Sequence, residues 1–143
     1  MIRRAKPSDV PALVALAHRA LQHVDIGNVV VSKTRISGAS CRLVSDPQSL
    51  VLVHESDGTI DGAIAVGVSD ALWFERKVAG ILFWYAEQPR TGYAMLRQAV
   101  QWSLSRPVIK AIGLSEEFTF DPRIGKLLER AGLKRRGSVF ARY

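Results

Sequence analysis

The chain has 143 residues, of which 48% are hydrophobic, and a formal net charge of +7. This length fits one domain over residues 1–143 with a sizeable core, and no uncharged apolar run is long enough to span a membrane. A single cysteine, Cys41, excludes an internal disulfide, and the three histidines do not cluster with it, so no metal site is expected. No apolar segment typical of a signal peptide follows the N-terminus, and we therefore expect a cytoplasmic protein.

The first third of the chain predicts a strand followed by one or two helices. Residues 1–5 are typical of a short strand. Apolar residues then recur at helical spacing from Val10 to Leu21, and Ser8 is the expected N-cap of that helix. The stretch 32–45 is ambiguous and could form a second helix, weakened by a glycine.

The middle of the chain predicts three strands. Residues 50–55 and 60–69 are apolar strand patterns, and Asp57-Gly58 between them indicates a tight hairpin turn. Residues 78–87 form the most apolar of these segments, which favours a central position in the sheet.

The last third predicts two helices and two strands. A helix is expected over residues 95–104 and a strand over 108–114. Asp121-Pro122 is typical of a helix start, and Gly132 is expected at the C′ position where that helix ends. Residues 133–143 supply a final strand or hairpin. This order predicts an α/β fold, a mixed sheet with about four helices on both of its faces.

The junction between 78–87 and the following helix reads "QPRTGYAML" and has two interpretations. It can be a plain loop in which Pro89 and Gly92 only interrupt regular structure. It can also bind phosphate, because a helix start has unpaired N–H groups and a partial positive charge. Gly92 would let the backbone approach an anion, Ala94 would keep the helix surface low, and Arg90 could add a charged contact.

The whole pattern resembles the GNAT superfamily of acetyl-CoA-dependent N-acetyltransferases over nearly the full chain. "MIRRAKPSDVPALVALAHRAL", "VLVHESDGTIDGAIAVG", "FWYAEQPRTGYAMLRQAVQWS" and "RIGKLLERAGLKRRG" are similar to its successive elements. The family loop reads Gln or Arg, two residues, Gly, one residue, then Gly or Ala. Gly92 and Ala94 match its second half. Pro89 departs from its first position, and Arg90 could take over that role.

The resemblance implies that acetyl-CoA is the co-substrate, with its pyrophosphate at the loop and its pantetheine arm along the fourth strand. Two basic residues of the last helix would then meet the adenosine end. The residues implied to contact acetyl-CoA are Tyr85, Ala86, Arg90, Thr91, Gly92, Tyr93, Ala94, Arg123 and Lys126.

The chemistry that the resemblance implies is direct attack of a primary amine on the thioester, which needs a base, a polarised carbonyl and an acid. The acid of the family is often a tyrosine, and Leu128 replaces it here. Tyr85 and Ser115 are the candidates in its place. The candidates for the base are Glu75 and Glu87. Glu75 could instead be a surface carboxylate paired with a neighbouring cation, and Glu87 could instead be a solvated carboxylate without a catalytic role. The acceptor amine is not evident, and a second subunit could complete its pocket, which leaves a homodimer open.

The basic C-terminal region supports a rival hypothesis. From Asp121 to Tyr143 there are seven basic and two acidic residues, a net charge of +5. A GNAT-fold protein without activity could use Lys134, Arg135 and Arg136 to bind nucleic acid or an acidic protein. The simpler alternative is a solvated basic face, because no recognised nucleic-acid-binding motif is present.

Overall fold

The computed structural model describes residues 1–23, 30–73, 75–113 and 123–136. The elements are β1 (Ile2–Arg4), a short 3-10 turn (Pro7–Asp9), α1 (Val10–Leu21), α2 (Lys33–Ser45), β2 (Leu50–Ser56), β3 (Thr59–Asp70), β4 (Lys77–Ala86), α3 (Pro89–Leu104), β5 (Ile109–Gly113) and α4 (Arg123–Arg130). The strands form a sheet in the order β1-β2-β3-β4-β5. Each neighbouring pair is antiparallel except β4 and β5, which are parallel. The predicted mixed sheet is therefore confirmed.

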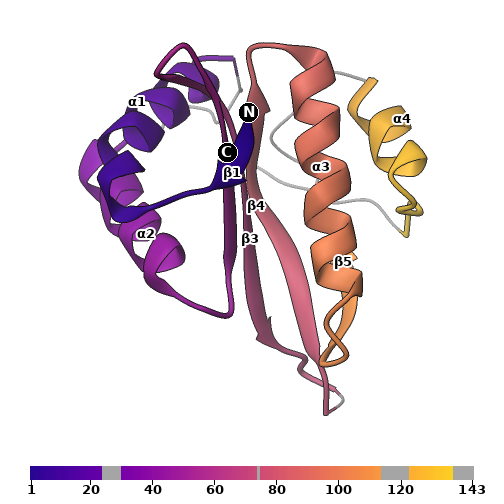
Figure 1. The fold of residues 1–143 in the computed structure, drawn as a ribbon. Helices are drawn as coiled ribbons and strands as arrows, with labels where there is room; N and C mark the ends of the chain where they lie inside the picture. Colours follow the sequence, from indigo (N-terminus) through magenta and orange to yellow (C-terminus); the bar gives the residue numbers. More distant parts are fainter. Residues whose placement is uncertain (24–29, 74, 114–122, 137–143) are drawn as a thin grey trace.

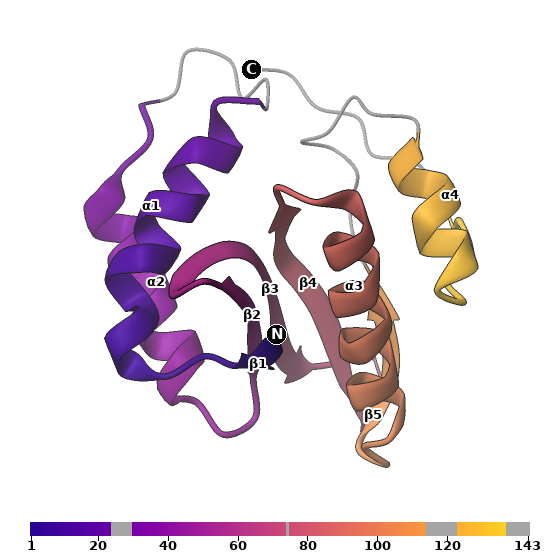
Figure 2. The same ribbon diagram turned by 45° about the horizontal axis from the view of Figure 1, so that its top comes forward.

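The helices cover both faces of this sheet, with α1 and α2 on one side and α3 and α4 on the other (Figures 1 and 2). β2 is buried on both faces, which explains its unbroken apolar run. Its Val51 and Val53 pack in the core beneath α1, whereas Leu50 and Leu52 pack in the core beneath α3. The alternation of side chains along each strand thus divides the apolar residues between two cores that share one sheet.

Two local predictions are confirmed by backbone geometry. Asp57 and Gly58 have φ angles of 51° and 76°, as a two-residue hairpin turn with a primed conformation requires. Gly132 has a φ angle of 96°, and the N–H of Leu133 donates to the carbonyl of Leu128 over 3.0 Å. These features form a Schellman motif that ends α4 with glycine at C′.

The ambiguous stretch 32–45 is a helix. Its N-cap is Ser32, whose Oγ accepts a hydrogen bond of 3.2 Å from the backbone N–H of Arg35. Leu43 and Val44 near its other end pack against the core beneath α1. A capped start and apolar residues directed to the sheet outweigh the weak helix propensity of Gly38.

The prediction that Ser8 caps the first helix is wrong. The residue that precedes α1 is Asp9, whose side chain makes no capping bond to that helix and instead bonds back to Lys6. The N–H of Lys6 donates to Asp9 Oδ2 over 2.8 Å, and the N–H of Asp9 donates to the carbonyl of Lys6 over 2.8 Å. This closes the 3-10 turn, and α1 begins only at Val10.

The third helix begins six residues earlier than the expected Met95. Gln88 has extended backbone angles, and the N–H of Gly92 donates to its carbonyl over 3.0 Å, so the first helical turn starts at Pro89. Proline is favoured at this position because its fixed φ suits a helix and its missing N–H would be unpaired there. Most of the expected loop is therefore helix.

Two predicted features lie partly or wholly outside the described residues. The expected helix start at Asp121-Pro122 lies outside them, and α4 is described from Arg123. The first part of the expected final strand, residues 133–136, has no regular structure, and the rest of that strand lies outside the described ranges.

An ionic cluster of three residues connects β1 to β2 and to the 3-10 turn that follows β1. Arg3 Nε donates to Glu55 Oε2 over 2.7 Å, and its two terminal nitrogens donate to the carboxylate of Asp9 over 2.7 and 3.0 Å. Asp9 is only 6% exposed. The hydrogen bonds from Arg3 lower the pKa of Asp9 below its usual value, against an opposing contribution from burial.

We expect Asp9→Asn to reduce the free energy of unfolding at pH 7 by about 1–3 kcal/mol, because the amide cannot replace a buried carboxylate in this cluster. Since the pKa of folded Asp9 lies below the ordinary value of 3.8, its contribution is full above that pH and is lost as the pH falls through the lower folded value. Urea unfolding from pH 7 to pH 2 should therefore show a shallower loss in the variant. Asp57→Asn, at an exposed turn residue, is the control. Parent-like stability of Asp9→Asn at pH 7 would contradict this assignment.

Candidate functional site

β4 and β5 pair only along the first part of β4. Their register runs from Lys77 opposite Ile109 to Gly80 opposite Gly113. β4 continues to Ala86, still paired with β3 on its other side. Within the described residues, the second half of β4 therefore has one free edge.

The backbone groups at that free edge belong to Trp84 and Ala86. The N–H of Glu87 donates to the carbonyl of Asp61 over 2.9 Å, so this position is bonded to β3. Because bonded and non-bonded pairs alternate in antiparallel sheets, Tyr85 also directs its backbone groups to β3, and Trp84 and Ala86 direct theirs outward. Of Tyr85 and Ala86, the two residues of β4 that the family resemblance places against acetyl-CoA, Ala86 has this orientation and Tyr85 does not.

A β-bulge at Leu82 precedes the free edge. Ala65 pairs with Phe83 and Val66 pairs with Ile81, which leaves Leu82 as the extra residue of β4. Its side chain is 63% exposed and lies over Gly67, where an added Cβ would be 2.8 Å from Leu82 Cδ1. Bulges change which way the following side chains point and are frequent beside functional sites.

The N-terminus of α3 begins where β4 ends. Among the described residues, the backbone N–H groups of Arg90 and Thr91 have no hydrogen-bond partner, and Gln88 makes no capping bond with its side chain. The side chain of Arg90 is exposed next to them. Free N–H groups, the helix dipole and a guanidinium together make this end of α3 suitable for an anion.

Gly92 lies where α3 packs most closely against β4. It is buried, and an added Cβ would lie 3.3 Å from Ala86 Cβ and 3.6 Å from Trp84 Nε1. Trp84 Nε1 also donates to the carbonyl of Gly92 over 2.9 Å. The absence of a side chain at Gly92 thus brings α3 close to β4, and the approach of its backbone to an anion stays a prediction.

A hydrogen bond joins Tyr93, near the start of α3, to the end of α4. Tyr93 Oη donates to the carbonyl of Arg130, at the last residue of α4, over 3.3 Å. Ala94, the next residue of α3, is half-buried. Leu128, at the position of the family tyrosine, is 6% exposed and belongs to the core beneath α3. Burial in this core explains why the side chain is apolar. A leucine side chain has no acidic proton and cannot serve as the acid.

The residues of α4 that sequence analysis linked to acetyl-CoA are both exposed. Arg123 is the first residue of α4, and Lys126 follows it by one turn. α4 lies beside α3 on the same face of the sheet (Figure 2).

The candidate catalytic residues do not form one group. Glu75 is exposed in the turn before β4, and β4 has 10 residues, so about 30 Å separates this turn from the start of α3. Tyr85 lies near the other end of β4, with a half-buried side chain packed against the core beneath α1. Trp73 is 86% exposed in the same turn as Glu75. Ser115 lies outside the described residues.

Glu87 lies much closer to the free edge of β4 than Glu75 does. It directly follows Ala86, and its Oε1 accepts a bond of 3.1 Å from Arg19 Nη2 of α1. The alternation along 78–87 indicates that Tyr85 and Glu87 share a face, which the contact with α1 bears out. The partner Arg19 could not be inferred, because 68 residues separate the two in the chain.

A second pair that sequence analysis missed is His54 with Asp61, whose Nδ1 and Oδ1 are 2.5 Å apart. His54 pairs in register with Gly62, and Gly62 pairs with Ala86, so the three residues form a row across the sheet. Both side chains are about one fifth exposed, at 19% and 18%. Two strand spacings of about 4.8 Å separate His54 from Ala86, so His54 does not lie at the free edge of β4.

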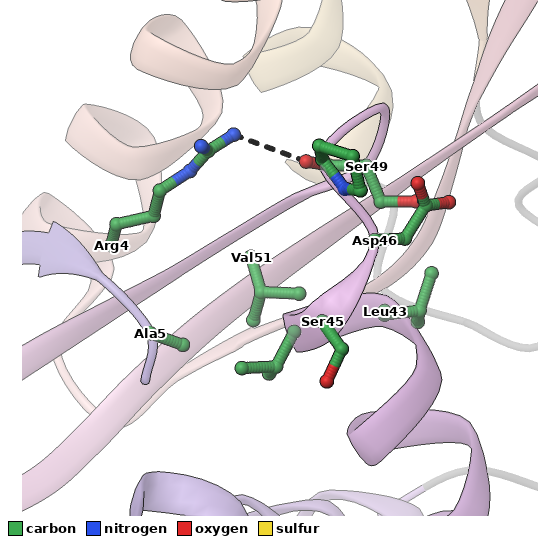
Figure 3. Close-up of a pocket in the computed structure, with 9 residues that line it drawn as sticks. Arg4, Ala5, Leu43, Ser45, Asp46, Ser49 and Val51 are labelled. Carbon is green, nitrogen blue, oxygen red and sulfur yellow. Dashed lines mark hydrogen bonds between the residues drawn. The ribbon is translucent and has the colours of Figure 1, made fainter. Parts of the chain in front are cut away.

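A small cavity lies elsewhere, between β1, β2 and α2 (Figure 3). Its volume is about 70 Å³, and Arg4 crosses it to donate to the carbonyl of Ser49 over 3.1 Å. Ligand pockets are usually several hundred Å³, so this space suits a few water molecules. Within the described ranges, no helix is long and apolar enough to cross a membrane, and no three His, Cys, Asp or Glu side chains cluster as a metal site would need.

We expect Gly92→Val to lower the free energy of unfolding by about 1–3 kcal/mol, because the new side chain must displace Ala86 and Trp84. Gly38→Val is the matched control, since this second helical glycine has only the tip of the Arg42 side chain nearby, at 3.6 Å. Urea denaturation measures both. Equal effects at the two positions would contradict close packing of α3 on β4.

Comparison with protein-family models finds no match, and comparison with curated proteins finds none either. Solved structures, in contrast, match over the whole chain. A predicted acetyltransferase from Clostridium acetobutylicum, solved with acetyl-CoA, has a TM-score of 0.77 at 15% identity and is covered over 95% of its length. Glucosamine-6-phosphate N-acetyltransferase from Arabidopsis thaliana has a TM-score of 0.73 at 13% identity and 97% coverage.

An aminoglycoside 6'-N-acetyltransferase from Acinetobacter haemolyticus matches with a TM-score of 0.72 at 12% identity, again over 100% of this chain and 97% of the other. In all three matches the whole of this chain is aligned. Identities this low establish the fold and leave the acceptor open. The chain has the fold of the GNAT acetyltransferases, as its sequence predicts.

Proposed function

We propose that the protein transfers an acetyl group from acetyl-CoA to a primary amine. One observation supports this most directly. Two sets of backbone groups that have no hydrogen-bond partner among the described residues lie together at one end of the sheet. The outward groups of Trp84 and Ala86 line the free edge of β4, and the free N–H groups of Arg90 and Thr91 begin just beyond it.

Coenzyme A has the two chemical features that such a site needs. Its pantetheine arm contains amides that can bond the edge of a strand as another strand would. Its pyrophosphate suits the N-terminus of a helix, and the exposed Arg90 adds a charge-assisted bond. We assign Thr91, Tyr93 and Ala94 to the wall of the same site, and Arg123 and Lys126 to the 3′-phosphate end. Gly92 contributes by setting the position of α3 against β4.

The structural neighbours support the same co-substrate and vary in acceptor. One is described with acetyl-CoA, one acts on glucosamine 6-phosphate and one on aminoglycosides. The feature common to the two named acceptors is an amine. We therefore propose acetyl transfer to an amine and assign no more specific acceptor.

In the proposed reaction, the amine nitrogen attacks the thioester carbonyl. A nitrogen–carbon bond forms, the carbon–sulfur bond breaks, and the ammonium group of the acceptor loses a proton before attack. An outward N–H at the free edge of β4 would stabilise the negative charge on the carbonyl oxygen. The nitrogen gives up a second proton as the amide forms, the thiolate leaves and takes up one proton as CoA, and one proton is released overall.

We assign the base to Glu87, in place of Glu75, because Glu87 adjoins the free edge and Glu75 lies at the far end of β4. The bond from Arg19 would hold the Glu87 carboxylate on the α1 side of the strand. Tyr85, which shares that side, remains our candidate for the acid. Ser115 stays a second candidate.

Acetyl-CoA should raise the melting temperature of the protein with the logarithm of its concentration, because it binds only the folded state. Arg90→Glu should weaken the binding about ten-fold or more, since it removes a charge-assisted bond and places a negative charge beside the phosphates. Arg35→Glu makes the same change on α2 and should leave binding unchanged. The absence of any shift with millimolar acetyl-CoA, or a shift that ADP reproduces in full, would refute the proposed co-substrate role.

Glu87→Gln should lower kcat by about 10²–10⁴-fold, as expected for the loss of a general base, and should preserve the thermal shift by acetyl-CoA. Release of free CoA thiol in the presence of a panel of amines measures the rate. Glu75→Gln is the matched control and should keep parent activity. A variant pair with the opposite outcome would move the base to the far end of β4 and rule out our assignment.

A further inference from the structure

The net charge of the protein is concentrated on one part of its surface. α3, α4 and residues 131–136 contain eight basic residues and one acidic residue, Glu129. All eight basic residues are exposed, and we call them the basic strip: Arg90, Arg97, Arg123, Lys126, Arg130, Lys134, Arg135 and Arg136. The whole chain has 20 basic and 13 acidic residues, so the remainder has twelve of each and no net charge.

The basic strip is continuous across the two helices. Arg90, Tyr93 and Arg97 follow one another at spacings of three and four residues, which places them on one side of α3. The bond from Tyr93 Oη to the carbonyl of Arg130 joins this side to α4. α3 and α4 lie side by side in both views (Figures 1 and 2).

In the described part of the chain, three basic residues outside the strip are neutralised by acidic partners, and most of the strip is not. Arg3, Arg19 and Lys77 all form ion pairs of 2.7–3.1 Å with carboxylates. Within the described part of the chain, six members of the strip have no ion pair: Arg90, Arg97, Lys126, Arg130, Lys134 and Arg136. Like charges held together repel one another, and a polyanion relieves that repulsion.

Acetyl-CoA would engage only one end of the strip. The proposed phosphate contacts are Arg90, at the start of α3, and Arg123 and Lys126, at the start of α4. α4 has 8 residues and is about 12 Å long, so Lys134 and Arg136 lie beyond its opposite end. These residues need a longer anion than the nucleotide of one coenzyme.

The scarcity of apolar anchors on the strip favours nucleic acid over protein or lipid. On the described residues of α4 and 131–136, no large hydrophobic side chain is exposed, and on α3 only that of Leu104, its last residue, is exposed. Protein interfaces use aromatic and apolar anchors, and membrane-bound helices insert them, whereas nucleic-acid interfaces are polar and strongly positive. Six of the eight members are arginines, whose guanidinium groups match phosphate oxygens in pairs.

We propose that the basic strip binds the phosphate backbone of nucleic acid, without reading its sequence. The proposed acetyl-CoA site uses three members of the strip and gives the other five no role in acetyl transfer: Arg97, Arg130, Lys134, Arg135 and Arg136. The inference rests on these five residues and so does not depend on acetyl transfer. It implies a strong dependence on salt, because each neutralised phosphate releases a counterion. For about six contacts, affinity should fall by about 10³-fold between 50 and 200 mM salt.

The experiment is fluorescence anisotropy of a labelled 20-base-pair DNA duplex, titrated with the full chain at both salt concentrations. The double substitution Lys134→Gln with Arg136→Gln should weaken binding about ten-fold or more and reduce the slope of log affinity against log salt by about two. Lys33→Gln with Arg35→Gln, the same charge change on α2, is the matched control and should bind as the parent does.

Three results would overturn the proposal. One is no binding of the duplex at 50 mM salt. Another is an equal loss in the α2 control, which would mean attraction by overall charge only. The third is tighter binding of polyglutamate than of DNA, which would assign the strip to an acidic protein. The thermal shift by acetyl-CoA should persist in the Lys134, Arg136 variant, so failure of this proposal and failure of acetyl transfer give different results.

Discussion

The close contact between α3 and β4 is the constraint on which the candidate site depends. Gly92 of α3 lies against Ala86, and Trp84 Nε1 bonds the Gly92 carbonyl over 2.9 Å. A few residues further along α3, Met95 reaches Gly62 of β3, whose added Cβ would meet Met95 Cε at 2.9 Å. Small residues on both elements thus fix the start of the helix directly over the end of the strand.

This contact decides where the unsatisfied backbone groups lie. A helix that began at Met95, as its hydrophobic pattern indicates, would leave residues 88–94 as a loop. With α3 beginning at Pro89, its first N–H groups lie next to the edge of β4 instead, and neither set has a partner among the described residues. One tight packing interaction therefore brings two kinds of hydrogen-bonding surface together, and their chemistry follows from that arrangement.

The order of strands and helices was readable because each element has a local cause. Alternating or continuous apolar residues predict the strands, Asp57-Gly58 predicts its turn, and Gly132 predicts the end of α4. The features that could not be read depend on contacts between distant residues. The bond between Arg19 and Glu87 spans 68 positions, and Gly92 acquires its packing role only once α3 lies on β4. The distance between Glu75 and the start of α3 has the same kind of cause, because a sequence does not reveal which segments lie near the end of a strand.

The bulge at Leu82 has a further consequence, which concerns the parity of β4. Ile81 faces the core beneath α3, and Phe83, two positions later, faces the opposite core, although a regular strand would place both on one side. Leu82 is the extra residue of the bulge, so the alternation of side chains between the two faces shifts by one residue after it. We call the alternation after Leu82 the second frame. In that frame Trp84 and Ala86 lie beneath α3, and Tyr85 lies beneath α1. β4 therefore tolerates loss of Leu82 without exchanging its faces, because the two frames then join as one regular strand.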